Sequence, residues 1–141
     1  MAYPLLTNRV ELRRMIESLF SQPNYVASKK MLDATTLRHE AIASNLANIE
    51  TPGYRRLDMS QSFQTELKQA LSTQNADQIA DIRPSLEVDS GAAAQRADGN
   101  TVQLETELGE LQKNLLEHSV GTQLITGALL RLRLAITGRP T

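Results

Sequence analysis

The chain has 141 residues, the size of one ordinary domain, of which 40% are hydrophobic and 22% are charged. Aromatic residues make up only 4%, so the core must be built from aliphatic side chains, which suits packed helices better than a β-sandwich. The lack of cysteine excludes disulfides and thiolate zinc sites, and a net charge of −1 disfavours binding to nucleic acid phosphates.

Residues 1–24 are predicted to form an N-terminal arm with a short amphipathic helix. Val10, Leu12, Met15 and Ile16 recur at helical spacing, but so short a helix is not stable alone. We therefore expect the arm either to stay mobile or to order against a partner. No basic segment followed by a long apolar run opens the sequence, so no cleaved secretory signal is expected.

Residues 25–50 are predicted to form the N-terminal core helix. Ala34, Leu37, Ala41 and Ile42 recur at spacings of three and four, which marks one apolar face. Pro52 provides the stop, because the residue before a proline avoids the helical conformation.

Residues 51–99 are predicted to form a small irregular middle region. Turn signals occur at residues 74–77, 83–85, 89–91 and 98–100. A short helix near residues 67–71 and a short strand at residues 85–88 are compatible with the sequence, so the region could contain β-structure.

Residues 100–138 are predicted to form a long C-terminal helix, about 50 Å in length at 1.5 Å per residue. Ten positions step by four and three, the spacing of a coiled-coil seam, and two of the ten are polar. They are Leu104, Leu108, Leu111, Leu115, His118, Thr122, Ile125, Leu129, Leu132 and Ile136. The interior glycines Gly109, Gly121 and Gly127 each cost about 1 kcal/mol in an isolated helix, so we expect this helix to draw stability from neighbours.

The expected fold is mainly α, with the helices of residues 25–50 and 100–138 paired in one antiparallel, coiled-coil-like helical domain. We expect the first helix to contribute Leu37, Ala41, Leu46 and Ile49 to the helix–helix interface. From the second helix we expect Leu108, Leu111, Leu115, Ile125, Leu129 and Leu132. The apolar stripe of the C-terminal helix is longer than the N-terminal helix, so the N-terminal helix cannot cover all of it. The apolar surface that remains exposed predicts assembly with other copies.

Catalytic chemistry finds little support in the sequence. His39 and His118 are the only histidines and lack further ligands at metal-binding spacing. Glycine-rich phosphate loops and nucleophile elbows are absent, and Glu105, Glu107, Glu110 and Glu117 are typical of the wet face of a helix. We therefore expect no enzyme activity, cofactor, metal or small-molecule substrate.

The most specific segment runs from Ser44 to Tyr54. Asparagine is a mediocre helix former, so Asn45 and Asn48 near a helix end suggest side-chain amides that bind the backbone of a neighbouring chain. The segment resembles the Asn-Leu-Ala-Asn-x-x-Thr-Pro-Gly-Tyr motif of bacterial flagellar rod, hook and hook-associated proteins. The residues that match are Asn45, Leu46, Asn48, Thr51, Pro52, Gly53 and Tyr54.

Two further segments make the chain similar to the flagellar basal-body rod family, and within it to the proximal rod proteins. They are residues 32–40 with 54–58, and residues 98–105 leading into the last helix. The resemblance covers roughly residues 19–137 and implies a structural subunit that self-assembles into a tubular drive shaft for motility, with the motif residues as assembly candidates.

The resemblance also implies partners and a location. The partners would be further copies, other rod proteins (FlgC, FlgF and FlgG-like), the adaptor FliE, the membrane-ring protein FliF and the flagellar type III export apparatus. The location would be the periplasmic rod of the basal body, reached without a cleaved signal peptide. Two alternatives stay open on the sequence: another rod component such as FlgC, or a soluble coiled-coil adaptor.

Overall fold

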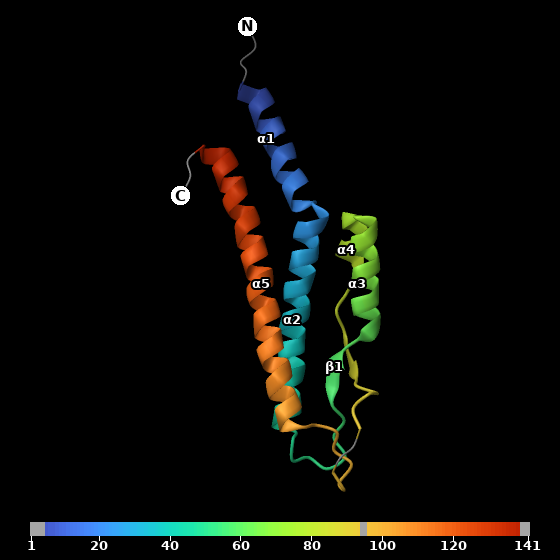
Figure 1. Cartoon of the computed structure of the whole chain (residues 1–141). Coiled ribbons are helices and arrows are strands. Elements are labelled where there is room, and N and C mark those ends of the chain that lie inside the picture. Colours follow the sequence, from blue (N-terminus) through green and yellow to red (C-terminus); the bar gives the residue numbers. More distant parts are fainter. Residues whose placement is uncertain (1–4, 94–95, 139–141) are drawn as a thin grey trace.

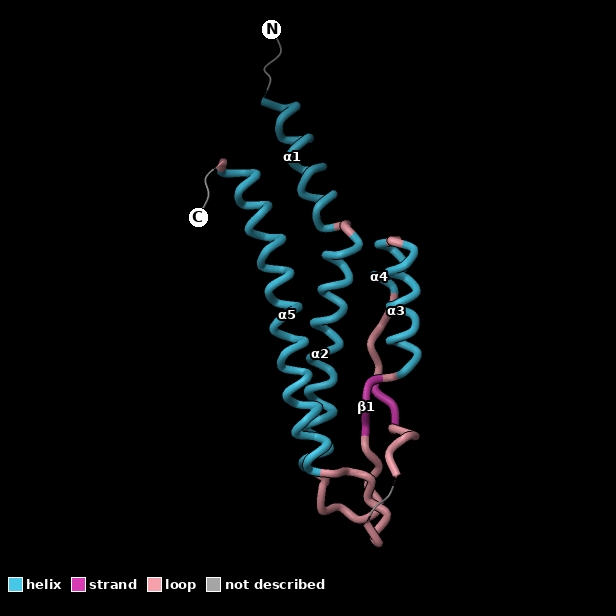
Figure 2. The backbone as a smooth tube through the Cα atoms, viewed as in Figure 1, coloured by secondary structure: helices cyan, strands magenta, loops and turns pink. Residues whose placement is uncertain are grey.

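The computed structural model describes residues 5–93 and 96–138. Within these residues, α1 begins and α5 ends at the same end of an elongated molecule, and the loops that join α2 to β1 and β2 to α5 lie at the other (Figures 1 and 2). The elements, in chain order, are α1 (Leu5–Phe20), α2 (Pro23–Ala47), β1 (Leu57–Met59), α3 (Gln61–Thr73), α4 (Ala76–Asp81), β2 (Leu86–Val88) and α5 (Leu104–Thr137).

Helix α2 is the central element. Helix α5 runs antiparallel along it, while β1, α3 and α4 contact α2 from elsewhere on its surface (Figure 1). The prediction of a mainly α fold with paired N- and C-terminal helices and a small middle region containing strands is confirmed.

A proline separates α1 from α2. Gln22 has an extended backbone, with ψ at 132°, and Pro23 opens α2, where its missing N–H costs no helical hydrogen bond. The rings of Phe20 and Tyr25 meet edge to face across this break, with their centroids 5.1 Å apart. The break therefore sets the angle at which α1 leaves α2.

The middle of the chain is more regular than the sequence predicts. Strands β1 and β2 pair antiparallel, with Leu57 opposite Val88 and Met59 opposite Leu86. Two polar residues act as helix caps: the Ser60 hydroxyl accepts from the Ser62 N–H, and the Asn75 amide oxygen accepts from the N–H groups of residues 77 and 78. Asn75 lies in a predicted turn, and the sequence did not reveal its role as a cap because turn-forming residues and caps have the same chemistry.

The hydrophobic core lies between α2, the hairpin and the α3–α4 pair. It is aliphatic apart from one phenylalanine, as the composition predicts. Leu37 packs against this core. The buried members are Ala27, Met59, Phe63, Leu67, Ala70, Ile79 and Ile82.

The seam between α2 and α5 differs from the predicted one. Leu108, Leu115 and Leu129 are 45%, 54% and 43% exposed, so they are not the buried centre of this seam. The buried residues of α5 are instead Glu107, Asn114 and Gly121. Leu111, Ile125 and Leu132 of α5 are half-buried. On α2, Ala41 is buried and Leu46 is half-buried, and Ile49, two residues after the end of α2, is also half-buried.

Polar contacts explain why this face of α5 turns inward. The Asn114 amide donates to the carbonyl of Thr35 at 2.9 Å, and the Thr35 hydroxyl lies 3.0 Å from His118 Nδ1. A Cβ added at Gly121 would lie 2.9 Å from Leu32 Cδ2. The α2–α5 seam thus combines matched polar groups with close approach at a glycine, and it leaves the leucines outside.

Gly121→Leu should destabilise the monomer by about 1–3 kcal/mol, because the new side chain must displace Leu32. The matched control is Gly109→Leu on the same helix, where an added Cβ meets nothing within 4 Å. Urea unfolding followed by circular dichroism measures both. Equal stability of the two variants would contradict close packing at Gly121.

Candidate functional site

The motif of residues 44–54 ends α2 and begins the return toward β1. Asn45 is fully buried, at 0% exposure. Its amide nitrogen donates to the Leu57 carbonyl at 2.8 Å, and its amide oxygen accepts from the Leu57 N–H at 2.9 Å. The same nitrogen lies 3.1 Å from Glu107 Oε2. One side chain therefore joins α2, β1 and α5.

This arrangement corrects the expectation for Asn45. The sequence suggested that its amide binds the backbone of a neighbouring chain, but its partners lie within the same chain. An amide offers a donor and an acceptor side by side, so it pairs with an extended residue much as a β-strand does. Burial leaves Asn45 no surface on which to meet another subunit.

The other motif residues build the turn. Asn48 donates back to the Ser44 carbonyl at 2.9 Å, and the Thr51 hydroxyl donates to Asn48 Oδ1 at 3.2 Å. Gly53 has φ at +70°, a left-handed conformation that favours glycine. The half-buried Tyr54 hydroxyl lies 3.0 Å from the Ser44 hydroxyl, whereas Thr51, Pro52 and Gly53 are exposed.

Asn100 is distant from α2 in the sequence but contacts the backbone at the C-terminal end of this helix. Its exposure is 1%, and its amide nitrogen donates to the carbonyls of Asn48, Ile49 and Thr51 at 3.0, 3.1 and 2.8 Å. These carbonyls follow the last residue of α2, and Asn100 adds to the hydrogen bonds that they accept from the Thr51 N–H, the Tyr54 N–H and Arg96. The Gly53 N–H also donates to the Asp98 carbonyl at 2.9 Å. The two family-like segments of the sequence thus lie against each other.

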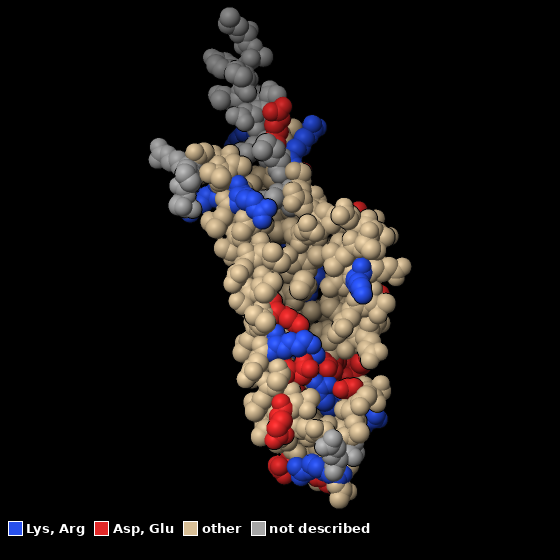
Figure 3. Space-filling model, viewed as in Figure 1, with Lys and Arg blue, Asp and Glu red and all other residues tan. Residues whose placement is uncertain are grey.

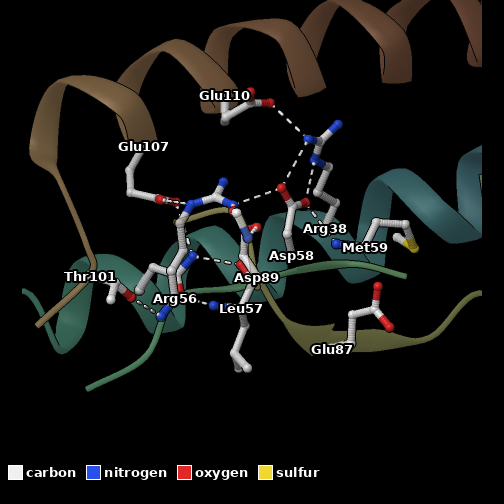
Figure 4. Close-up of polar contacts among 12 residues, drawn as sticks. Arg38, Arg56, Leu57, Asp58, Met59, Glu87, Asp89, Thr101, Glu107 and Glu110 are labelled. Atoms are coloured by element: carbon white, nitrogen blue, oxygen red, sulfur yellow. Dashed lines mark hydrogen bonds and ion pairs between the residues drawn. The ribbon is translucent and has the colours of Figure 1, made fainter. Parts of the chain in front are cut away.

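Arg56 is the centre of a buried ionic site beside the motif (Figure 4). It is 5% exposed, and its Nε donates to Glu107 Oε1 at 2.6 Å. Its Nη1 donates to Asp58 at 2.8 Å and to Asp89 at 2.7 Å. Burial alone lowers the pKa of Arg56, but the hydrogen bonds and charges of Asp58 and Glu107 outweigh it and raise the pKa above its ordinary value.

Arg38 extends the site along α5. Its Nη2 lies 2.8 Å from Glu110 Oε2, and its Nε lies 3.2 Å from Asp58 Oδ1. We name Arg38, Arg56, Asp58, Asp89, Glu107 and Glu110 the arginine–carboxylate cluster. The sequence did not predict this cluster, because its members are separated by up to 72 positions. The prediction that Glu107 and Glu110 lie on the wet face is wrong for Glu107, which is 0% exposed, and Glu110 is half-buried beside Arg38.

Asp58 has a depressed pKa within the cluster. Burial alone raises the pKa of its carboxyl group, but the hydrogen bonds from Arg56 and the Met59 N–H, with the charges of Arg38 and Arg56, lower it overall. The ionised form is therefore stabilised in the folded state.

The described residues contain no group of three or more His, Cys, Asp and Glu side chains placed to hold a metal ion. His39 is exposed, and His118 contacts Thr35 in the α2–α5 seam. Of the helices in residues 5–93 and 96–138, none is long and apolar enough to cross a membrane. The side chains of this site instead join segments that are distant in the sequence: α2, the turn after it, β1 and the start of α5.

Known proteins are similar to this chain in sequence. A model of the family described as "Flagella basal body rod protein" matches residues 32–55, which cover the second half of α2 and the turn after it. The chain is 32% identical over 113 residues to "Flagellar basal body rod protein FlgB" of Aquifex aeolicus, covering 79% of this chain and 90% of that protein. Proteins of the same name from Borrelia hermsii and Escherichia coli are 26% and 27% identical, covering 67% and 72% of this chain and 82% and 83% of theirs.

The paired helices, the motif turn and these similarities define a bacterial flagellar basal body rod protein. Within that class the chain belongs to the FlgB family. The relatives support a structural rod subunit, and they do not favour the alternatives of a FlgC-type component or a soluble adaptor.

Glu107→Gln should destabilise the fold by about 3–5 kcal/mol, because it leaves the buried charge of Arg56 without its closest partner. Glu66→Gln removes an exposed carboxylate from α3 and should change stability by no more than about 0.5 kcal/mol. Chemical denaturation at neutral pH compares the two variants. Similar small losses would show that the Arg56–Glu107 pair is dispensable.

The stability of the fold should fall in acid partly through Asp58. Because the pKa of Asp58 is lower in the folded state, its contribution is complete above the unfolded pKa of about 3.9 and is lost as the pH drops through the folded value. Asp58→Asn should lower stability at neutral pH and flatten the loss below about pH 4. Urea unfolding midpoints, measured from neutral to acidic pH, give the change of stability with pH. Asp33→Asn on the exposed face of α2 is the control. An unchanged slope in Asp58→Asn would exclude this role.

Proposed function

We propose that the chain is a subunit of the proximal rod that assembles by covering exposed leucines of α5 with helices of neighbouring subunits. Ten large apolar residues of α5, here named the leucine face, are 43–66% exposed. They are Leu104, Leu108, Leu115, Leu116, Val120, Leu124, Leu129, Leu130, Leu134 and Ile136.

The leucine face is the observation that carries the proposal. Apolar surface of this extent on one helix costs free energy in water and is typical of an interaction site. The residues of α5 that are buried in the monomer are Glu107, Asn114 and Gly121, so packing against α2 leaves the leucine face exposed. In a single subunit, α5 therefore has an exposed apolar surface that other chains can contact.

Family membership supports the choice of partners. We assign to this surface further copies and the related rod proteins FlgC, FlgF and FlgG-like, and we include FliE, FliF and the type III export apparatus as neighbours. Within the motif, the exposed Thr51, Pro52 and Gly53 stay candidates for contacts between subunits. The subunit would act in the periplasmic rod after export without a cleaved signal.

The proposed role is mechanical. Many helix–helix contacts would add up to a stiff shaft, with no bond chemistry and no cofactor. The arginine–carboxylate cluster would serve this role by holding α2, α5 and the hairpin as one rigid body.

Leu115→Asp should leave the monomer folded and secreted but abolish rod assembly and swimming. Leu115 is 54% exposed, so a carboxylate there costs little in the monomer but would be buried without a partner between subunits. Motility in soft agar and the presence of the subunit in isolated basal bodies are the readouts. Gln112→Asp, also exposed on α5, is the matched control and should assemble normally. Normal motility of Leu115→Asp would contradict assembly through the leucine face.

A further inference from the structure

The net charge of −1 is the sum of two oppositely charged regions and a neutral remainder. The first region is the end of the molecule formed by α1 and the last turns of α5. It carries five exposed arginines and two glutamates, a net charge of +3, and Figure 3 shows basic side chains at this end. We name the five arginines the arginine tip: Arg9, Arg13, Arg14, Arg131 and Arg133.

The second region is the arginine–carboxylate cluster with two glutamates at its edge. Glu87 lines a cavity together with Asp58 and Asp89, and Glu117 Oε2 lies 4.0 Å from Arg38 Nη1. With these glutamates the region holds six carboxylates and two arginines, a net charge of −4. We name its carboxylates the acidic patch: Asp58, Glu87, Asp89, Glu107, Glu110 and Glu117.

The rest of the sequence is balanced. Of the 15 basic and 16 acidic residues of the chain, eight of each lie outside the two regions, so the imbalance of charge is concentrated in them. On the visible face, most acidic side chains lie away from the tip (Figure 3). Among the described residues, none of the ion pairs joins the arginine tip to the acidic patch, and Arg13 pairs with Glu17 on its own helix. One copy therefore does not neutralise its own two regions.

The acidic patch can be reached from solvent. The side chains of Asp58, Asp89 and Glu110 are 21%, 27% and 26% exposed. Two cavities lie against them: one of about 380 Å³ is lined by all three, and one of about 330 Å³ is lined by Asp58, Glu87 and Asp89. The two arginines of the cluster balance only part of the negative charge. A further guanidinium suits this surface, because its forked N–H donors match carboxylate oxygens.

A second copy of the chain carries the matching groups. Its arginine tip has nearly the charge that the acidic patch region lacks, and all five tip arginines are exposed. Attraction between surfaces of opposite sign orients two molecules during their encounter, whereas like charges placed together are unfavourable. Contacts from tip to tip or from patch to patch are therefore disfavoured, and charge selects a contact between the unlike regions of two copies.

We propose that the arginine tip of one copy binds the acidic patch of a second copy that is displaced along the long axis. Because the two surfaces differ, the contact is head-to-tail, and its repetition from copy to copy builds a ring or a helix. The contact uses no residue of the leucine face. It rests on the self-assembly proposed above and adds to it a second, electrostatic contact that sets the stagger between copies.

Cross-linking of single-cysteine variants tests this contact, because the chain has no cysteine of its own. Val10→Cys places a thiol between tip arginines on α1, and Ser90→Cys places one beside Asp89; both positions are exposed. The two full-length variants are mixed in low salt and treated with a short bismaleimide. We expect a mixed dimer that exceeds the dimers of either variant alone, and at least about a 10-fold loss of it in about 1 M salt, where charges are screened within about 3 Å.

Ser72→Cys on the exposed surface of α3 is the matched control for position and should give little mixed dimer with Val10→Cys. Adding Arg9→Glu/Arg14→Glu to the Val10→Cys chain should reduce the mixed dimer with Ser90→Cys at least about 10-fold. Adding Arg55→Glu/Arg83→Glu makes the same change in net charge at exposed residues outside the tip and should leave the mixed dimer unchanged. Circular dichroism should show that all variants keep their helices.

Leu115→Asp distinguishes this contact from assembly through the leucine face. Chains that carry it should still give the salt-sensitive mixed dimer, even where they fail to assemble a rod. Four results would overturn the proposal: equal cross-linking to Ser72→Cys and Ser90→Cys, an equal loss in the Arg55/Arg83 control, a mixed dimer that persists in about 1 M salt, and dimers of Val10→Cys alone as the main product, which would indicate a symmetric contact.

Discussion

The buried pair of Arg56 and Glu107 is the interaction on which the arrangement of this subunit depends. Glu107 has no exposed surface, and Arg56 and Asn45 are the groups that satisfy its carboxylate. A shift of α5 along α2 would leave these charges buried and unpaired, which is far more costly than a slipped contact between two leucines. The ion pair therefore holds α5 in register with the segment that leads into β1, and Asn45 extends this register to α2.

That register also divides the surface of α5. Inward positions carry a glutamate, an asparagine and a glycine, each with a partner or a close neighbour on α2 or β1. Outward positions carry the leucine face. The polar groups that are paired within the chain, such as the Glu107 carboxylate and the Asn114 amide nitrogen, need no partner from another subunit. Apolar groups can pack against many helices without one fixed geometry. The subunit thus has specific contacts inside and adaptable surface outside.

Sequence periodicity predicted both long helices and their pairing, because an apolar repeat of 3.5 residues can be recognised within each segment before its partner is known. It did not predict which side of α5 faces α2. Leu108, Leu115 and Leu129 are more apolar than Glu107, Asn114 and Gly121, so the pattern favoured the leucines. The polar seam is stable only because Arg56, Thr35 and Leu32 meet it in space, and such distant pairings leave no local signal. The same limit hid the role of Asn100, which was recognised as part of a turn and a family-like segment but not as a helix cap.

The hairpin has a consequence for how this architecture can vary. The Ser60 N–H donates to the Ser85 carbonyl at 2.9 Å, so the chain leaves and re-enters the hairpin at adjacent points. The segment between β1 and β2, which includes α3 and α4, is therefore an insertion between two paired strands. An insertion whose ends already touch can be lengthened, shortened or exchanged at little entropic cost while the stem stays paired. Diversification within such a lineage would thus be concentrated in this lobe, and the paired long helices could keep one geometry.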